Sequence, residues 1–198
     1  MKSVFLSRHA ETESNREGKI MGQSDSALTE KGISDTGKII KVLSKEDINI
    51  IISSPLGRAS TTAGMFSKEL QKPAVIHDGL AELSSGLWEG KYRHEVLPEK
   101  EPIRKSWNEK PQGGESFYDT EERVKRVIKL VKTLSVKYNI LLVGHGGINQ
   151  VLLTLWYNLP KERKTLPLQP HNLVYILSDD EVRWIDSSGE KGEGWWKP

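Results

Sequence analysis

The 198-residue sequence contains no cysteine, so disulfide bonds, catalytic thiols and thiolate metal sites are excluded. It also lacks long apolar runs, and none approaches the ~18 residues that a membrane-spanning helix needs. The amino terminus runs directly into a short apolar segment, without the apolar region and small-residue cleavage site of a secretory signal peptide. These absences predict a soluble protein of the cytoplasm.

An excess of charge of one sign is missing as well. Lys and Arg total 29 and Asp and Glu total 27, which gives a formal net charge of +2. Basic residues are interspersed with acidic ones, as in KERK at 161–164, and form no stripe of the kind that binds nucleic acid. We therefore expect neither nucleic acid nor a membrane as a partner.

Short apolar runs alternate with helical periodicities along the chain. The runs predict strands at about 4–7, 48–52, 73–76, 140–143, 173–177 and 182–185. The periodicities predict helices from an N-cap at Thr29 to about residue 43, and at about 57–70, 120–138 and 148–156. The apolar face of the first helix is expected to comprise Ile33, Gly37, Ile40 and Leu43. This alternation favours an α/β fold with a largely parallel sheet, in a single domain that spans 1–198.

Residues 77–115 interrupt the alternation. They contain several prolines and glycines and two tryptophans, and only one short helix is predicted, at about 91–96. A long segment of this kind in a compact domain is typical of a lid or a binding element. Within it, 92–112 is the expected specificity wall, with the basic side chains Arg93, His94, Arg104 and Lys105.

Polar side chains suited to catalysis follow each of the first four predicted strands. Arg8 and His9 end the first strand, and Arg58 follows the second. Glu82 lies in the loop after the third strand, and His145 ends the fourth. Because the carboxyl ends of parallel strands lie at one edge of a sheet, these side chains can converge there. Two arginines and two histidines around one point suit a compact dianion such as phosphate.

These residue types also suit the hydrolysis of a phosphate monoester. Since the uncatalysed reaction is extremely slow, a covalent route through a histidine nucleophile is expected, and His9 must then be neutral. The positive charges of Arg8 and Arg58 favour the neutral ring by repulsion, while Glu82 can supply the proton that a leaving alkoxide needs. For the first motif alone, an ordinary surface ion pair of Arg8 and a hydrogen-bonded half-buried His9 remain an equal alternative.

Six motifs occur in the order in which they occur in the histidine phosphatase (phosphoglycerate mutase-like) superfamily, and the chain resembles its cofactor-independent phosphatase branch. RHAETESN at 8–15 resembles the family's R-H-G-x-T-x-x-N. The others are LTEKG at 28–32, SPLGRA at 54–59, LAE at 80–82 with WEG at 88–90, GGES at 113–116 and GHGG at 144–147.

This resemblance implies a three-layer α/β/α sandwich, no metal or cofactor, and specific roles for the matching residues. His9 would form the phosphohistidine and Glu82 would be the proton donor. The implied catalytic set is His9, Glu82, Arg8, Arg58 and His145. The implied phosphate- or substrate-binding set is Arg8, Asn15, Gln23, Arg58, His145 and the backbone N–H of Gly146.

Three positions depart from the family pattern. Ala10 replaces the usual glycine, which tightens the turn but leaves the chemistry possible. The segment GQSDSA at 22–27 lacks the Trp and Pro of the family's G-W-x-D-x-P, which leaves the substrate contacts of this loop open. Gln150 stands near the position where an arginine often follows the second histidine, and it receives no role.

Two other functions compete with a phosphatase. A bisphosphoglycerate-dependent phosphoglycerate mutase would use the same site, but Glu82 is followed by LSSG rather than by the R-x-Y-G of the mutase branch. An inert phospho-ligand or protein-binding module is disfavoured because His9, Arg58 and Glu82 are all present. The carboxyl-terminal strands offer an edge on which a homodimer can form. Surface or hydrogen-bonded positions are expected for His77, His94 and His171. Packing or docking of the tail is expected for Trp107, Trp195 and Trp196.

Overall fold

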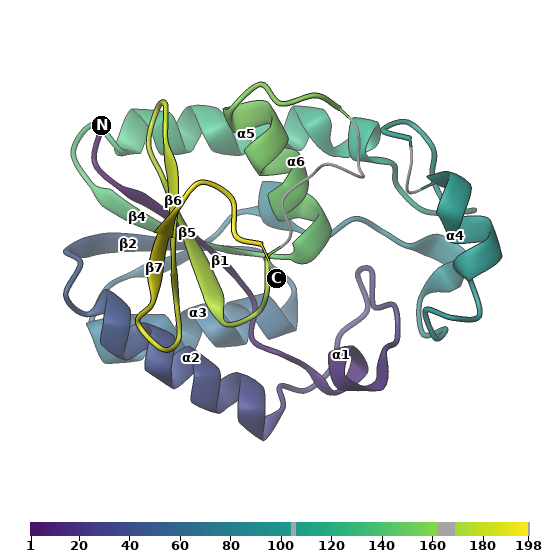
Figure 1. The fold of residues 1–198 in the computed structure, drawn as a ribbon, viewed down its shortest axis with the longest axis horizontal. Helices are drawn as coiled ribbons and strands as arrows, with labels where there is room; N and C mark the ends of the chain where they lie inside the picture. Colours follow the sequence, from purple (N-terminus) through teal and green to yellow (C-terminus); the bar gives the residue numbers. More distant parts are fainter. Residues whose placement is uncertain (104–105, 162–168, 198) are drawn as a thin grey trace.

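The computed structural model describes residues 1–103, 106–161 and 169–197. Its centre is a seven-stranded sheet with the order β3-β2-β4-β1-β5-β6-β7 (Figure 1). The strands are β1 (Val4–Arg8), β2 (Ile48–Ser53), β3 (Ala74–Ile76), β4 (Asn139–Gly144), β5 (Leu173–Leu177), β6 (Val182–Asp186) and β7 (Lys191–Glu193). Strands β1 to β4 pair in parallel, and β5 to β7 extend the sheet in antiparallel fashion. The α/β class with a parallel central sheet is confirmed.

Helices cover both faces of the sheet, which gives the expected three layers. In Figure 1, α2 and α3 lie below the sheet and α5 and α6 above it. The helices are α1 (Glu13–Glu17), α2 (Glu30–Leu43), α3 (Gly57–Leu70), α4 (Leu97–Ile103), α5 (Phe117–Leu134) and α6 (Gly146–Trp156), with 3₁₀ turns η1 (Asp78–Leu80) and η2 (Gly86–Trp88). Successive strand side chains face opposite layers. Accordingly, Phe5 packs with Phe66 of α3, whereas Leu6 packs with Val127 of α5.

Helix α1 was not predicted, because five residues are too few to show a period. Its ends are nevertheless encoded locally. The Thr12 side chain accepts from the Asn15 backbone N–H while the Asn15 side chain accepts from the Thr12 backbone, which is a capping box. Gly18 ends the helix in the left-handed conformation (φ 75°). The loop expected from residue 16 onward therefore begins after this helix.

The buried face of α2 differs from the predicted one. Ile33 is 47% exposed, and the buried residues are Gly32, Thr36, Ile39, Ile40 and Leu43. The rotation of the helix is set at Gly32, where an added Cβ would lie 2.4 Å from the Glu11 carbonyl oxygen. This close approach seats the first turn of α2 directly on the chain that follows β1.

The helix predicted at about 91–96 is wrong, since the structure has a turn there and helix α4 begins only at Leu97. The backbone of this segment instead pairs with the chain after α1. Ile20 N–H donates to the Lys91 carbonyl (2.9 Å), and Arg93 N–H donates to the Gly18 carbonyl (3.0 Å). Backbone groups paired in this way cannot form helical hydrogen bonds.

The carboxyl-terminal tail is docked onto the sheet. Strand β7 pairs with β6, and the Trp195 ring packs edge-on against Tyr157 and Tyr175. The structural interpretation of Trp195 is confirmed, whereas the strand in this tail was missed. In the described part of the chain, no helix combines the length and apolar character that a membrane crossing requires.

Candidate active site

His9 lies directly beyond the carboxyl end of β1, where its backbone N–H donates to the Gly144 carbonyl (2.9 Å). Its ring Nδ1 donates to the Ala10 carbonyl (2.7 Å), so a neutral ring carries its lone pair on Nε2. Burial, followed by the neighbouring His145 and Arg8, lowers the pKa of His9 well below its usual value. The neutral state is as expected, but desolvation is its main cause and the arginines are secondary.

Ala10 occupies the position where the family motif has glycine. Its backbone N–H donates to Thr62 Oγ1 (3.0 Å) and its carbonyl accepts from His9. Among the described residues, positive φ angles outside glycine occur only at Gln71 and Asn158. The turn at Ala10 therefore needs no glycine, and the alanine leaves the His9 contact intact.

Two arginines lie beside His9 with part of each guanidinium unpaired. Arg58, near the start of α3, donates to the carbonyls of Ser24 (2.6 Å) and Gly22 (2.8 Å). Arg8 donates to the Gln169 carbonyl (3.2 Å). In both arginines the Nε atom is buried without a hydrogen-bond partner. Burial is the main cause that lowers the pKa of Arg8 to about 10, and both side chains remain cations at neutral pH.

His145 lies beneath His9, with 5.1 Å between the ring centroids. Its Nε2 is 2.7 Å from Ser54 Oγ, which already accepts the Leu56 backbone N–H. When the Ser54 hydroxyl donates to Nε2, the neutral His145 ring carries its proton on Nδ1. This Nδ1 is buried and has no partner. Burial, followed by the charges of Arg58 and Arg8, lowers the pKa of His145 well below its usual value.

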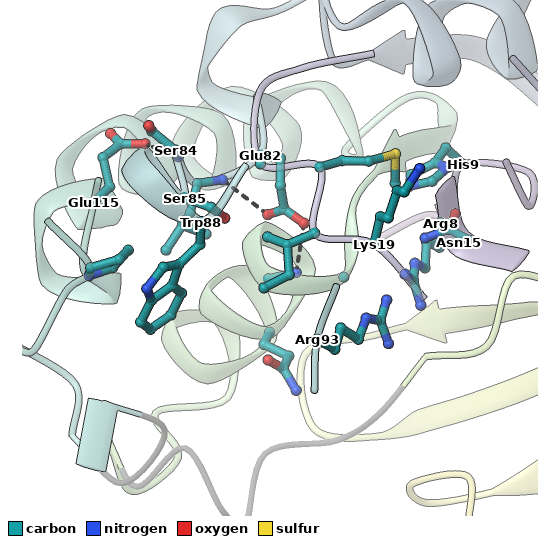
Figure 2. Close-up of a pocket in the computed structure, with 18 of the residues that line it drawn as sticks. Arg8, His9, Asn15, Lys19, Glu82, Ser84, Ser85, Trp88, Arg93 and Glu115 are labelled. Carbon is teal, nitrogen blue, oxygen red and sulfur yellow. Dashed lines mark hydrogen bonds between the residues drawn. The ribbon is translucent and has the colours of Figure 1, made fainter. Parts of the chain in front are cut away.

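The carboxylate of Glu82 sits on the amino terminus of helix α6. Gly147 N–H donates to one oxygen (3.0 Å) and Ile148 N–H to the other (2.9 Å). Figure 2 shows this carboxylate pointing into the pocket that holds His9. These two backbone N–H groups fix the position of the Glu82 carboxyl group, so Glu82 faces the same space as His9.

Arg123 of α5 holds the loop that carries Glu82. Its Nη1 donates to the Ala81 carbonyl (2.5 Å), and its Nη2 donates to Glu115 (3.1 Å). Glu115 in turn accepts from the Ser84 backbone N–H (2.9 Å). The Arg123–Glu115 ion pair therefore holds the backbone on both sides of Glu82.

Of the other predicted binding residues, Asn15 and Gly146 line the pocket that holds His9, and Gln23 does not. The side-chain oxygen of Asn15 is used in the α1 cap, and the residue also lines the pocket. Gly146 lines the pocket as well, and a Cβ there would lie 3.4 Å from the Arg8 guanidinium carbon. Gln23 is exposed, outside the pocket lining, and its amide donates to the Glu82 carbonyl (3.0 Å). Gln23 therefore contacts the Glu82 loop and not the space above His9.

One pocket of about 610 Å³ contains the predicted residues Arg8, His9, Asn15, Arg58, Glu82 and Gly146 (Figure 2). His145 is not among the lining residues and contacts the pocket through the His9 ring. Of the predicted specificity wall, Arg93 lines this pocket, whereas His94 lies outside the lining and stacks on Tyr92. Arg104 and Lys105 lie outside the described residues. Gln150, which received no role, also lines the pocket.

Sequence reasoning missed two residues near this pocket. His171 Nδ1 donates to the His9 carbonyl (2.6 Å), and the two rings meet edge-on with 5.0 Å between their centroids. Trp196 lines the pocket from the carboxyl-terminal tail. Neither residue stands in a recognisable motif, and both reach the site only through long-range folding. No cluster of three or more metal-ligating side chains occurs in the residues that the structure describes.

Comparison with known proteins agrees with this geometry. A family model described as the histidine phosphatase superfamily (branch 1) matches residues 4–190. A putative phosphoserine phosphatase 2 of Hydrogenobacter thermophilus is 33% identical over 160 residues, which are 78% of each chain. A probable phosphoglycerate mutase GpmB of Cronobacter sakazakii is 33% identical over 165 residues, 81% of this chain and 77% of the mutase.

Among solved structures, a mycobacterial glucosyl-3-phosphoglycerate phosphatase in complex with VO3 superposes with a TM-score of 0.84. The match covers 93% of this chain and 96% of the other at 23% identity. It supports the fold.

Proposed function

We propose, from the fact that this chain belongs to the histidine phosphatase superfamily (branch 1), that His9 forms a phosphohistidine intermediate. The chain is a phosphomonoester hydrolase of small phosphorylated metabolites, as its phosphatase-named relatives indicate. The residue roles below are our proposal. They rest on the arrangement of donors around His9.

The observation that carries the proposal is a set of three buried nitrogen atoms without partners. Arg8 Nε, Arg58 Nε and His145 Nδ1 belong to the few buried polar side-chain atoms that lack a hydrogen bond in the described part of the chain. A buried donor without a partner is costly, at roughly 1–3 kcal/mol, and rare in native proteins. All three residues lie around His9, and the oxygens of a tetrahedral dianion would satisfy them together.

The reaction then proceeds in two displacements. His9 Nε2 attacks phosphorus as the P–O bond to the leaving group breaks, and Glu82 gives its proton to the leaving oxygen. Water next attacks the phosphohistidine and gives a proton to Glu82, and inorganic phosphate leaves. Arg8, Arg58 and His145 stabilise the charge on the phosphoryl oxygens in both steps.

A single-turnover labelling experiment tests this proposal. Wild-type protein is mixed with a phosphate-labelled phenyl ester, quenched, and compared with His9→Ala. An acid-labile, base-stable phosphoenzyme that forms in the wild type and is missing in the variant supports His9 as the nucleophile. Label that persists in His9→Ala, or turnover without any phosphoenzyme, would overturn the mechanism.

A phosphoglycerate mutase is the second candidate, and the 33% identity to a probable phosphoglycerate mutase favours it. A mutase transfers its phosphoryl group to a phosphoglycerate, whereas a phosphatase transfers it to water. The decay of the labelled phosphoenzyme with and without 3-phosphoglycerate separates the two functions. Decay to inorganic phosphate at the same rate in both cases is expected for the phosphatase, and label in bisphosphoglycerate would establish the mutase.

We also propose a cytoplasmic location and a homodimer, both carried over from the sequence. Light scattering of the purified protein tests the dimer, and a scattering mass of 22.4 kDa would refute it.

A further inference from the structure

The pocket extends well beyond the phosphoryl site. Its volume of about 610 Å³ lies within the range of pockets that hold whole cofactors or drug-sized ligands. The residues proposed to bind the phosphoryl group occupy one end. The outer wall includes four other segments, namely the chain after α1 that contains Lys19, the chain from η2 to α4, the chain that leads into α5, and the carboxyl-terminal tail. Figure 2 shows Trp88 and Glu115 at the end remote from His9.

Part of this outer wall is apolar and exposed. Leu97 lines the pocket and is 43% exposed. Trp196 lines it from the tail and is half-buried, while the neighbouring Trp195 anchors the tail on Tyr157 and Tyr175. Apolar side chains exposed in a concave site mark ligand contacts, and an indole suits a flat apolar partner. Both side chains therefore offer contact surface to an apolar or aromatic group of a ligand.

Arg93 adds a cation to the same wall. Figure 2 shows its guanidinium turned toward that of Arg8, and its charge is one of the causes that lower the pKa of Arg8. Within the described ranges no carboxylate forms an ion pair with Arg93. Lys19, the other cation of the wall, differs because it is paired with Glu17. Two guanidinium groups that face each other across a pocket favour a bound anion between or beside them.

We propose that the alcohol released by this enzyme is bulky and carries its own negative charge. Its apolar body lies against Leu97 and Trp196, and its anionic group is bound by Arg93. The proposal rests on the proposed function, because it assigns the part of the substrate beyond the phosphoryl group. It places Arg93 and Trp196 as residues that determine substrate preference.

Matched substrates test the anionic contact. The probes are phosphate esters of 4-hydroxybenzoate, 4-hydroxyphenylacetate and 3-(4-hydroxyphenyl)propionate, each compared with its own primary amide, which removes the charge. Wild-type protein should prefer at least one acid over its amide by about tenfold in kcat/KM, the size expected for one charged hydrogen bond. Arg93→Gln should bring this ratio close to one. Any general effect of Arg93 on phosphate binding cancels in the ratio.

Arg126 provides the matched control. It is an exposed arginine on α5 outside the pocket, so Arg126→Gln should keep the wild-type acid-to-amide ratio. Wild-type protein that shows no preference in any of the three pairs would overturn the proposal, and so would an Arg93→Gln variant that keeps the preference.

Trp196→Ala tests the apolar contact with the anchor Trp195 left in place. The ratio of kcat/KM for 2-naphthyl phosphate over phenyl phosphate should fall several-fold in this variant, and an unchanged ratio would refute the contact. Phosphoenzyme labelling with phenyl phosphate is run on every variant. Loss of the His9 dependence of that label would refute the proposed function, whereas unchanged ratios with normal labelling refute only the substrate assignment.

Discussion

The proposed nucleophile, His9, is held by its neighbours through its backbone as well as through its ring. His9 donates from Nδ1 to the next carbonyl along the chain, and its own carbonyl accepts from His171. The first bond fixes the tautomer, and the second fixes the peptide group that carries the ring. We therefore expect His171 to be a positioning residue, which acts on the proposed reaction only through its contact with His9.

Replacement of His171 tests this role. His171→Ala removes one neutral hydrogen bond, worth about 1 kcal/mol, and should lower kcat about fivefold with a smaller effect on KM. His171→Asn keeps an N–H donor near the same place and should restore most of the loss. Steady-state kinetics on phenyl phosphate give both parameters. Equal kcat values for the Ala and Asn variants would show that the ring and not the hydrogen bond matters.

The residues at strand ends could be predicted from sequence because strand, turn and polar side chain are adjacent in the chain. Arg8, His9 and His145 are of this kind. The contact of His171 with His9 and the position of Trp196 in the pocket lining could not be predicted, since both depend on the antiparallel extension β5 to β7. A histidine or a tryptophan without a motif carries no signal of what it will contact after folding.

Among the elements, helix α5 holds the loop that carries the proposed proton donor, Glu82. Its Arg123 joins Ala81 and Glu115, and Glu115 holds the Ser84 backbone. A change at Arg123 should therefore loosen the loop that carries Glu82 and leave the phosphoryl end of the pocket in place.

This effect is tested by comparing kcat/KM for esters whose leaving groups differ in their need for a proton. Arg123→Ala should lower kcat/KM for an alkyl phosphate, whose alkoxide needs a proton from Glu82, at least tenfold more than for p-nitrophenyl phosphate, whose phenolate leaves without one. Arg126→Ala on the same helix should change neither. A uniform loss on both esters would indicate general disruption and would contradict the positioning role.

Gly32 lets helix α2 pack directly against the backbone of the first motif, at Glu11. A Cβ at Gly32 would meet the backbone oxygen and nitrogen of Glu11 at 2.4 and 2.8 Å, and backbone atoms there cannot move aside without shifting the chain after His9. Gly32→Ala should therefore destabilise the fold by about 1–3 kcal/mol. Urea unfolding measures the change.

Gly37 of the same helix is the matched control. Nothing lies within 4 Å of a Cβ at this position, so Gly37→Ala should stabilise the protein by up to about 1 kcal/mol through helix propensity alone. If both variants lost stability equally, the contact with Glu11 would not be the cause.

For the whole molecule, the buried histidines predict sensitivity to acid. The pKa values of His9 and His145 lie well below 6.5, and burial lowers that of His171 to about 3. In the unfolded chain these rings take up protons near pH 6.5, while the folded protein keeps them neutral. The unfolded state then binds more protons, so stability falls as the pH falls below 6.5.

As the pH falls, each such histidine lowers the free energy of unfolding by up to about 1.4 kcal/mol per pH unit. This loss continues until the pH reaches the folded-state pKa of that histidine. Urea unfolding between about pH 7 and pH 5 should show this loss. His171→Asn should make the dependence shallower by up to one proton, because asparagine does not titrate. A variant with the same pH slope as the wild type would contradict the assignment of a neutral His171.

At the scale of the fold, alternation of apolar runs and helical periods was enough to predict the α/β class and nearly all long elements, while the three layers followed from the family resemblance. It failed where tertiary pairing replaced local preference. Residues 91–93 pair with the chain after α1 instead of forming a helix, and Ile33 faces outward because Gly32 sets the rotation of α2. The segment 77–115 supplies part of the pocket wall, and its action as a lid stays a prediction.

The docked carboxyl-terminal tail has a consequence for the placement of affinity tags. Trp196 of this tail lines the pocket, so an affinity tag fused after residue 198 would lie close to the pocket wall. The amino terminus leads into the opposite end of β1, far along the sheet from His9 (Figure 1). A removable tag belongs at that end, and activities measured with a carboxyl-terminal tag would understate the turnover of bulky esters.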